Sequence, residues 1–146
     1  VDLATVHLSL GRSTLEKIAD KGVGILGVSL LTSAIPDECH RIYGGSPTET
    51  LLKLFSEASK TGITGVVCSP QDLRLLDQID PYRTLLRVCP GIRGFKDDRG
   101  DQQRTVSPAK AVSEGANLLV VGRPVVGRTD YLNAANLILN EINLVD

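Results

Sequence analysis

Two stretches of this chain read Leu85-Leu86-Arg87-Val88-Cys89-Pro90-Gly91-Ile92-Arg93 and Leu118-Leu119-Val120-Val121-Gly122-Arg123-Pro124. Each is a short apolar run followed by glycine, proline and arginine, and such a run is typical of a buried β-strand. Where strands alternate with helices, ligand-binding groups collect at the C-terminal ends of the strands, and the last two strand ends of a β/α barrel are a favoured phosphate site. The two stretches therefore predict buried strands with an anion site at one edge.

Arg93 and Arg123 are the candidate phosphate ligands. A planar guanidinium offers two parallel N–H donors to phosphate oxygens. The backbone amide of Gly122 can approach the same anion because no side chain stands in front of it. The alternative is that both arginines only contact solvent at the strand ends, or pair with Asp97 and Asp98.

The pattern of a strand followed by a helix repeats along the chain. Ser13-Thr14-Leu15-Glu16 predicts a capping box at the start of a first helix, and Ser46-Pro47-Thr48-Glu49 predicts another helix start. Between them, the polar residues 36–45 predict a loop that delays this helix. Strands are expected at residues 5–10, 25–31, 66–69, 85–89 and 118–121, and further helices after Ser69-Pro70, after Ser107-Pro108 and over residues 131–142.

Five units of this kind, with nearly continuous apolar strands, predict a parallel sheet covered by helices. Periodicity alone does not separate an open, doubly wound sheet from part of a barrel, because both need buried strands and right-handed crossovers. In part of a barrel, the strands at residues 5–10 and 118–121 would each leave an unpaired edge.

Composition excludes several classes of protein. The chain has 146 residues, the size of one domain, and its 16 basic and 17 acidic residues give a net charge of -1, so nucleic-acid binding is not expected. No apolar stretch reaches roughly 18 residues and no signal-peptide pattern is present, which predicts a cytoplasmic protein with no membrane partner. The absence of methionine predicts a fragment or a processed piece.

The cysteines and histidines offer little for catalysis. Cys39, Cys68 and Cys89 are odd in number and lack a disulfide or zinc spacing, so we expect buried, inert thiols and no metal site. His7 is expected to be a hydrogen-bonded structural residue rather than a general base. His40 is expected at the surface.

Five short elements occur in an order that is similar to one enzyme family. Pro90-Gly91-Ile92-Arg93, Gly100-Asp101-Gln102 and Val120-Val121-Gly122-Arg123-Pro124 follow one another, and Leu31-Thr32-Ser33 and Gly65-Val66-Val67-Cys68-Ser69 precede them. Together they resemble the C-terminal part of orotidine 5'-monophosphate decarboxylases. The resemblance implies an α/β fold, a partial (β/α)8 TIM barrel of about five C-terminal strand-helix units. Residues 1–146 would then be the C-terminal part of a single barrel domain.

The resemblance also implies which residues contact the substrate. The family's substrate-binding positions match Arg93, Gln102, Gly122 and Arg123, with Gln102 reaching in from a loop that folds over the ligand. Thr32 and Ser33 follow the second strand, where the family uses a hydroxyl to recognise the pyrimidine. The alternative for this pair is a turn cap before Pro36.

The reaction implied by the resemblance is decarboxylation of orotidine 5'-monophosphate to uridine 5'-monophosphate, without a cofactor and by a homodimer. The family's decarboxylating residues form an Asp-x-Lys-x-x-Asp pattern, which this sequence lacks. Five of its six lysines lie in expected helical segments, and Lys96 lies in a loop, where a solvated role is favoured over a contribution to an anion site. We therefore expect no catalytic residue in this chain, and no activity from it alone.

Two other functions stay open. The chain could be a non-catalytic phosphate-binding module built on a partial barrel. It could also belong to a related sugar-phosphate lyase or epimerase, although Leu31-Thr32-Ser33 and Pro90-Gly91-Ile92-Arg93 suit a pyrimidine nucleotide better.

Overall fold

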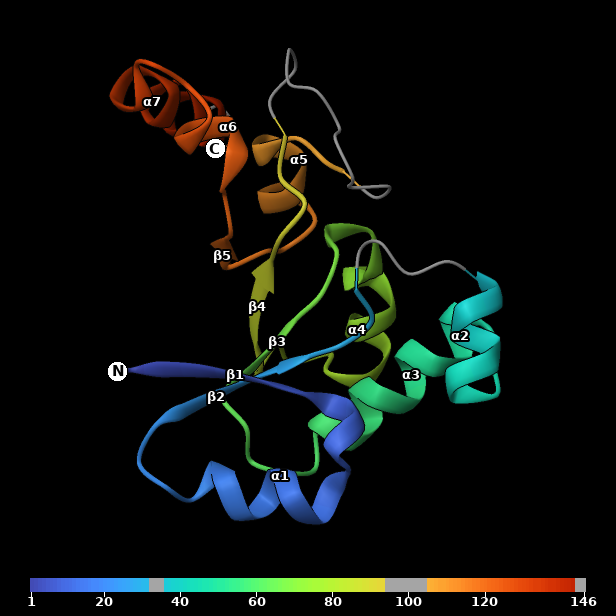
Figure 1. Ribbon diagram of the computed structural model, residues 1–146. Helices are drawn as coiled ribbons and strands as arrows, with labels where there is room; N and C mark the ends of the chain where they lie inside the picture. The colour runs from blue at the N-terminus through green and yellow to red at the C-terminus, as the bar shows by residue number, and fades with distance from the viewer. Residues whose placement is uncertain (32–35, 94–104, 144–146) are drawn as a thin grey trace.

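A computed structural model of the chain describes residues 1–31, 36–93 and 105–143. Its strands form one parallel sheet in the order β1-β2-β3-β4-β5, drawn in Figure 1. Their bounds are β1 (Leu3–His7), β2 (Gly24–Val28), β3 (Gly65–Val67), β4 (Leu86–Cys89) and β5 (Leu118–Leu119). Strands that follow one another in the chain are neighbours throughout, whereas a doubly wound sheet reverses its order at a switch point. The sheet is therefore built as part of a β/α barrel.

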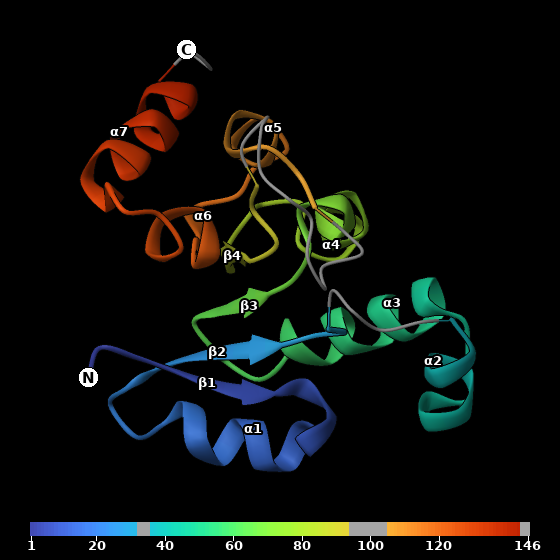
Figure 2. The same cartoon turned by 45° about the horizontal axis from the view of Figure 1, so that its top comes forward.

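The helices connect and cover these strands, as Figure 2 shows from a second direction. They are α1 (Arg12–Ala19), α2 (Pro36–Tyr43), α3 (Pro47–Ala58), α4 (Leu73–Ile79), α5 (Pro108–Ser113), α6 (Arg123–Val126) and α7 (Tyr131–Ile142). Two short 3-10 turns, η1 (Leu8–Leu10) and η2 (Pro70–Asp72), follow β1 and β3. In the described ranges, no helix is both long enough and apolar enough to span a bilayer.

The helix starts predicted at Ser46 and Ser107 are confirmed. The Ser46 hydroxyl accepts a hydrogen bond from the Glu49 amide at 3.3 Å, and the Ser46 amide donates to the Glu49 carboxylate at 2.9 Å. The Ser107 hydroxyl accepts from the Lys110 amide at 3.2 Å. These caps satisfy amides that the first turn of a helix leaves without partners. The last helix has the predicted bounds, Tyr131–Ile142.

The capping box predicted at Ser13 is wrong. α1 already begins at Arg12, so Ser13 lies inside the helix, and the helix has no side-chain cap. Gly11 precedes the helix with a φ of 81°, a conformation that glycine adopts without steric cost, and its carbonyl accepts the first helical hydrogen bond from Leu15. Glu16 pairs instead with Arg12, with 2.7 Å between Nε and Oε1.

The first strand is shorter than predicted. It ends at His7, and residues 8–10 form the 3-10 turn η1. The reason is a local side-chain bond: Nδ1 of His7 accepts a hydrogen bond from the Ser9 amide at 3.2 Å and turns the chain. The predicted hydrogen bond of His7 is thus present, and its structural role stays a prediction.

The loop predicted at residues 36–45 is also wrong, because α2 occupies residues 36–43. Proline at the first position of this helix and acidic Asp37 and Glu38 in its first turn favour a helix start. His40 and Arg41 in the last turn suit the negative end of the helix dipole. His40 is exposed, as predicted.

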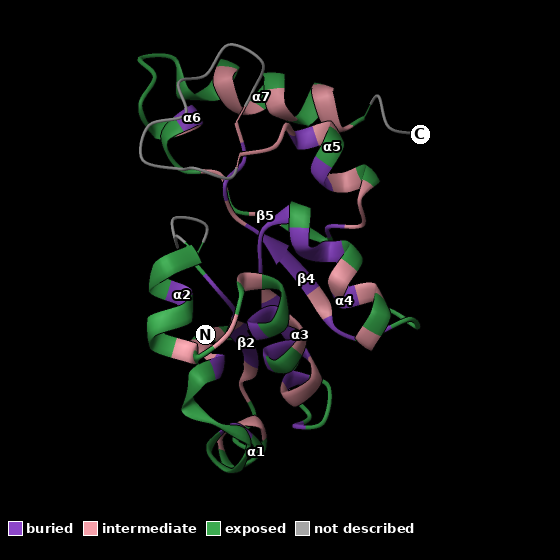
Figure 3. Cartoon of the chain, turned by 90° about the vertical axis from the view of Figure 1, so that its right-hand side faces the viewer, coloured by how far each residue is buried: buried purple, intermediate pink, exposed green. Residues whose placement is uncertain are grey.

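One face of the sheet makes the hydrophobic core. The register of the strands places Ala4, Val6, Ile25, Val66, Cys68 and Cys89 on this face. They pack against buried side chains of the helices, among them Leu15, Leu51, Phe55, Leu73 and Leu76. Figure 3 shows the buried residues concentrated where α3 and α4 cover the strands. The core thus lies between sheet and helices, as in the outer layer of a barrel.

The opposite face of the sheet is apolar but incompletely covered. Leu26 and Val88 are buried at its centre, whereas Leu3 on β1 and Leu118 on β5 are exposed. In the part of the chain that the structure describes, β1 and β5 each have a neighbouring strand on one side only, as predicted for the two edges.

A buried arginine lies within β4. Arg87 is fully buried, its Nη1 lies 2.7 Å from Oδ1 of Asp77, and its Nη2 donates to the carbonyl of Asp80 at 3.3 Å. These contacts hold the end of α4 against β4, because a buried guanidinium needs polar partners.

Asp80 organises the turn that leads into β4. Its carboxylate accepts hydrogen bonds from the Thr84 amide at 2.9 Å, the Thr84 hydroxyl at 2.8 Å and the Leu85 amide at 2.9 Å. Burial alone would raise the pKa of Asp80, but these hydrogen bonds and the charge of Arg87 outweigh burial and lower it. The carboxylate therefore stabilises the fold in its charged form.

We expect Asp80→Asn to lower the free energy of unfolding by roughly 1–3 kcal/mol at neutral pH, because an amide NH2 would face backbone N–H donors. Because the pKa of Asp80 is lower in the folded chain, the charged carboxylate stabilises the fold at a pH above the pKa of an aspartate in the unfolded chain, about 3.9. This stability is lost as the pH falls through the pKa of Asp80 in the folded chain. The difference in the free energy of unfolding between variant and wild type should therefore become smaller at acidic pH, as measured by urea unfolding at neutral and acidic pH. Asp2→Asn, at an exposed position, is the control. An unchanged difference at acidic pH would contradict this role.

Candidate functional site

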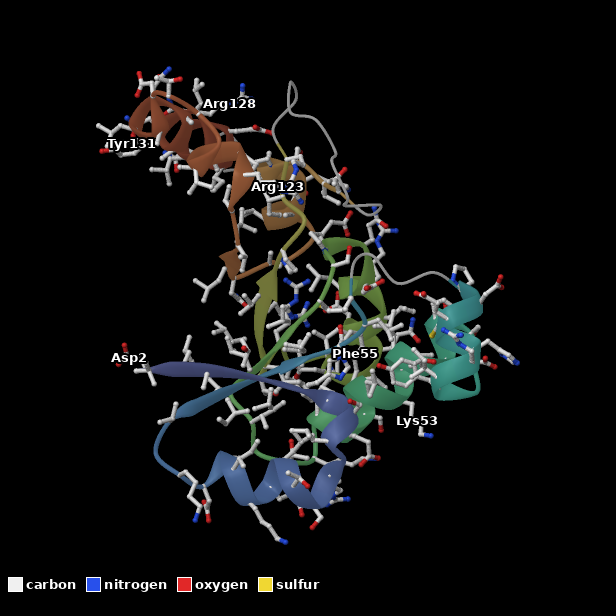
Figure 4. All side chains as sticks on the ribbon, viewed as in Figure 1. Asp2, Lys53, Phe55, Arg123, Arg128 and Tyr131 are labelled. Carbon is white, nitrogen blue, oxygen red and sulfur yellow. The ribbon has the colours of Figure 1, made fainter. Side chains whose placement is uncertain are left out.

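The two arginine-bearing stretches lie side by side at the C-terminal end of the sheet. Cys89 of β4 pairs with Leu119 of β5, and the Val120 amide donates to the Cys89 carbonyl at 2.9 Å. Arg93 stands four residues beyond Cys89, and Arg123 stands four residues beyond Leu119. Figure 4 shows Arg123 at the opposite end of the molecule from α1. The fold therefore brings both predicted phosphate ligands to one edge.

The backbone around Arg93 is fixed on two sides. The Arg93 amide donates to the Val106 carbonyl at 3.0 Å, and the Val106 amide donates to the Gly91 carbonyl at 3.2 Å. Gly91 has a φ of 78°, which suits glycine and turns the chain after β4. The Arg93 side chain is half-buried, and Nη1 donates to the Ile92 carbonyl at 2.8 Å. These contacts hold the arginine at the end of the strand.

The structure places Arg123 in a helix, whereas the sequence predicted it directly after the end of a strand. β5 ends at Leu119, and Arg123 is the first residue of the short helix α6, with Gly122 as its N-cap. Pro124 is buried and anchors the helix start, whereas Arg123 is exposed. Among the described residues, no atom lies within 4 Å of the place where a Cβ on Gly122 would stand. A role of the Gly122 amide in anion binding stays a prediction.

Three of the predicted site residues, Thr32, Ser33 and Gln102, lie outside the described residues, as does Lys96. The segment that leads to Thr32 is nevertheless positioned: the amide and the hydroxyl of Ser29 each donate to the Val67 carbonyl at 3.0 Å. Because β2 and β3 are parallel neighbours, the chain leaves β2 at the same edge of the sheet that carries Arg93. The positions of these three residues at the site remain expectations.

The lysines that the structure describes stand away from the strand ends. Lys17, Lys53 and Lys110 lie in α1, α3 and α5, and Lys21 and Lys60 lie in the turns after α1 and α3. Lys110 is paired with Glu114. Within the described ranges, no lysine directly follows a strand, and Lys21 and Lys60 lie in turns rather than in the helical segments expected for them.

Sequence reasoning missed a pocket between η2, α4 and α5. Its volume is about 530 Å³, and its polar lining includes Gln71, Arg74, Ser107, Lys110 and Glu114. Nε of Arg74 lies 3.2 Å from Glu114, and hydrogen bonds from Lys110 and Arg74 lower the pKa of that carboxyl. The spacing of Lys110 and Glu114, four residues apart, is the feature of the sequence from which this ion pair could have been predicted. Both cations of the pocket therefore pair with this carboxylate.

The three cysteines are buried and free of disulfides, as predicted. Sγ of Cys39 donates to Oγ1 of Thr50 at 3.3 Å. A hydrogen bond with Cys89 and burial raise the pKa of the Cys68 thiol, and the nearby charge of Asp72 raises it further. A raised pKa keeps the thiol protonated and unreactive.

In the folded chain at neutral pH, we expect fewer than one of the three thiols per chain, on average, to react with a chromogenic disulfide reagent within minutes. All three should react once the chain is unfolded, because unfolding exposes the buried sulfur atoms to the reagent. The absorbance of the released thiolate measures both. Fast reaction of one cysteine in the folded chain would reveal an accessible, nucleophilic thiol and reopen the question of thiol catalysis.

Comparison with known proteins agrees with this geometry. The sequence profile of the orotidine 5'-phosphate decarboxylase / HUMPS family matches residues 1–138. The chain belongs to this family. The relationship suggested by the sequence motifs is thereby confirmed.

Individual family members match almost the whole chain but only part of themselves. An orotidine 5'-phosphate decarboxylase of Gloeothece citriformis is 36% identical over 151 residues, covering 97% of this chain and 64% of the relative. One from Sphingopyxis alaskensis is 36% identical over 132 residues, covering 88% of this chain and 58% of the relative. The chain spans less than two thirds of the length of these relatives.

Solved structures of the family share the fold. The orotidine 5'-phosphate decarboxylase from Lactobacillus acidophilus superimposes with a TM-score of 0.80 at 28% identity, covering 98% of this chain and 64% of that structure. The enzyme from Metallosphaera sedula, at 18% identity, matches in fold with a TM-score of 0.69. The prediction of a partial TIM barrel is confirmed.

Proposed function

We propose that this chain is the phosphate- and pyrimidine-binding part of an orotidine 5'-phosphate decarboxylase, with residues 1–146 forming the C-terminal part of a single barrel domain. The observation that carries the proposal is the placement of Arg93 and Arg123 at adjacent strand ends in a member of this family. The complete protein would be a carboxy-lyase that converts orotidine 5'-monophosphate to uridine 5'-monophosphate and carbon dioxide. It would act without a cofactor, as a cytoplasmic homodimer.

In this proposal the arginines bind the phosphate. Arg93 and Arg123 donate charge-assisted hydrogen bonds to its oxygens, and the open backbone at Gly122 allows the amide to approach the same group. Gln102 adds a contact from the segment between the two arginines. Thr32 and Ser33 donate to and accept from the pyrimidine ring through short hydroxyls.

Phosphate binding contributes to catalysis although the phosphate does not react. Energy from contacts to a remote group can offset the cost of ordering the protein around the reacting carbon, which lowers the barrier to decarboxylation. Loss of carbon dioxide leaves a carbanion that must be stabilised and protonated. The sequence has no Asp-x-Lys-x-x-Asp pattern for this step, so the proposal assigns the step to residues outside this chain.

Calorimetric titration with uridine 5'-monophosphate, beside a decarboxylation assay of the complete protein, tests the proposal. Tight nucleotide binding together with release of carbon dioxide from orotidine 5'-monophosphate is expected. Binding without decarboxylation would favour the non-catalytic module. Turnover of a sugar phosphate with no effect on orotidine 5'-monophosphate would favour the lyase or epimerase.

A further inference from the structure

The pocket between η2, α4 and α5 is built from residues that the proposed phosphate site does not use. Its walls come from η2, from the start of α4, from α5 and from the segment 105–107 that precedes α5. Figure 3 shows α4 and α5 on the same side of the molecule, one above the other. Among the described residues that line the pocket, neither Arg93 nor Arg123 is present. The proposed function therefore gives this pocket no role.

The lining combines apolar and charged side chains. Pro70 and Val106 supply apolar surface. Arg74, Lys110 and Glu114 supply the charges. The volume of about 530 Å³ lies in the range of pockets that hold organic ligands. A pocket of this size, with an apolar wall and a few polar groups, suits a small organic molecule better than a bare inorganic ion.

The charged groups of the pocket favour an anion. Arg74 donates to both carboxylate oxygens of Glu114, at 3.2 Å and 3.4 Å, and Lys110 pairs with the same carboxylate. A guanidinium and an ammonium together carry about eight N–H donors, whereas one carboxylate offers about four acceptor sites. The side chains of Arg74 and Lys110 are 80% and 57% exposed, so a ligand can reach the donors that Glu114 does not accept. Two cations and one carboxylate also leave the lining with a positive sum of charges.

We propose that this pocket binds a small organic anion. The apolar body of the ligand packs against Pro70 and Val106, and its carboxylate or phosphate group accepts hydrogen bonds from Arg74 and Lys110. Glu114 has two effects on this site. It holds both cations in place when no ligand is bound, and its negative charge opposes the charge of the ligand.

The pocket shares a wall with the backbone that positions Arg93. The Val106 carbonyl accepts a hydrogen bond from the Arg93 amide at 3.0 Å, and the Val106 amide donates to the Gly91 carbonyl at 3.2 Å. A ligand that packs against Val106 stabilises this segment, and these two hydrogen bonds then open less often. Slower hydrogen exchange at the Arg93 and Val106 amides is therefore expected on binding, whether or not Arg93 binds phosphate.

Titration of the complete protein with benzoate and with phenyl phosphate, followed by ligand-observed nuclear magnetic resonance, tests the site. Benzamide has the same ring without a charge and is the control ligand. At least one of the two anions should bind and benzamide should not, and the tighter anion identifies the preferred acidic group. Arg74→Gln should weaken this binding about tenfold, because it removes a charged donor. Glu114→Gln should strengthen it about threefold, because it removes the opposing charge but keeps the shape of the side chain.

Arg12→Gln is the matched control, because it also removes an exposed arginine that pairs with a glutamate, but on α1. It should leave the affinity unchanged. Arg74→Lys keeps the charge without the planar fork and should bind with intermediate affinity. Circular dichroism checks that each variant is folded.

Arg123→Ala should bind the same anion normally, so this test and the test of the proposed phosphate site succeed or fail separately. Four results would overturn the proposal: no binding of either anion, equal binding of benzamide, equal affinities for Arg74→Gln and Arg12→Gln, or loss of binding in Arg123→Ala. Unchanged hydrogen exchange at the Arg93 and Val106 amides in the presence of saturating ligand would also contradict it.

Discussion

Arg123→Ala in the complete protein should weaken binding of uridine 5'-monophosphate by about 100-fold. A charge-assisted hydrogen bond contributes about 1.5–3 kcal/mol, and a bidentate arginine contact with phosphate supplies two of them. Loss of roughly 3 kcal/mol corresponds to two orders of magnitude in Kd. Arg123 is an exposed residue at the start of α6, so we expect a loss of binding rather than a loss of folding. Calorimetric titration measures the change.

The unphosphorylated nucleoside distinguishes a phosphate contact from general damage. Binding of uridine should change little in Arg123→Ala, because the lost donors face the phosphate. Arg41→Ala, which removes an exposed arginine from α2, is the charge-matched control and should leave both affinities unchanged. Equal losses for nucleotide and nucleoside would show that Arg123 does not bind phosphate.

The 146-residue chain alone should show no measurable decarboxylation of orotidine 5'-monophosphate. Transition-state stabilisation needs a positioned proton donor and charges around the reacting carbon. The sequence lacks the lysine-containing acidic pattern, and the described lysines lie in helices or in the turns that follow them. Release of carbon dioxide from labelled substrate is the measurement.

Addition of a polypeptide with three further β/α units, which would complete the eight of a barrel, should give turnover if that polypeptide carries the Asp-x-Lys-x-x-Asp pattern. The same polypeptide with its lysine replaced is the control, and it should bind without restoring activity. Turnover by the purified chain alone, surviving tests for a contaminating enzyme, would contradict this account and direct attention to His7 and the aspartates.

Local patterns predicted most of the elements, but the same pattern did not always give the same structure. Ser46 and Glu49 form a capping box, whereas Ser13 and Glu16, with the same spacing, do not. Ser46 stands at a helix start because proline follows it. Ser13 does not, because Gly11 turns the chain directly into a helix.

The burial of Arg87 could likewise not be predicted from the local sequence. Within an apolar run it could be read only as one residue of a strand, and the structure buries it completely. Its partners Asp77 and Asp80 lie on the preceding helix and turn. Packing of α4 on β4 creates this polar contact, and no spacing in the sequence predicts it.

The sequence by itself determined the parallel strand-helix architecture, because apolar runs, glycines and prolines act through local backbone preferences. The family followed from five short motifs that occur in one order. The tertiary structure decided how Arg93 and Arg123 reach the single edge that the sequence predicted for them. Their stretches are far apart in the chain, and the pairing of Cys89 with Leu119 brings them together. Parallel pairing is a long-range contact that local sequence does not specify. The same packing decided which apolar face of the sheet stays partly uncovered.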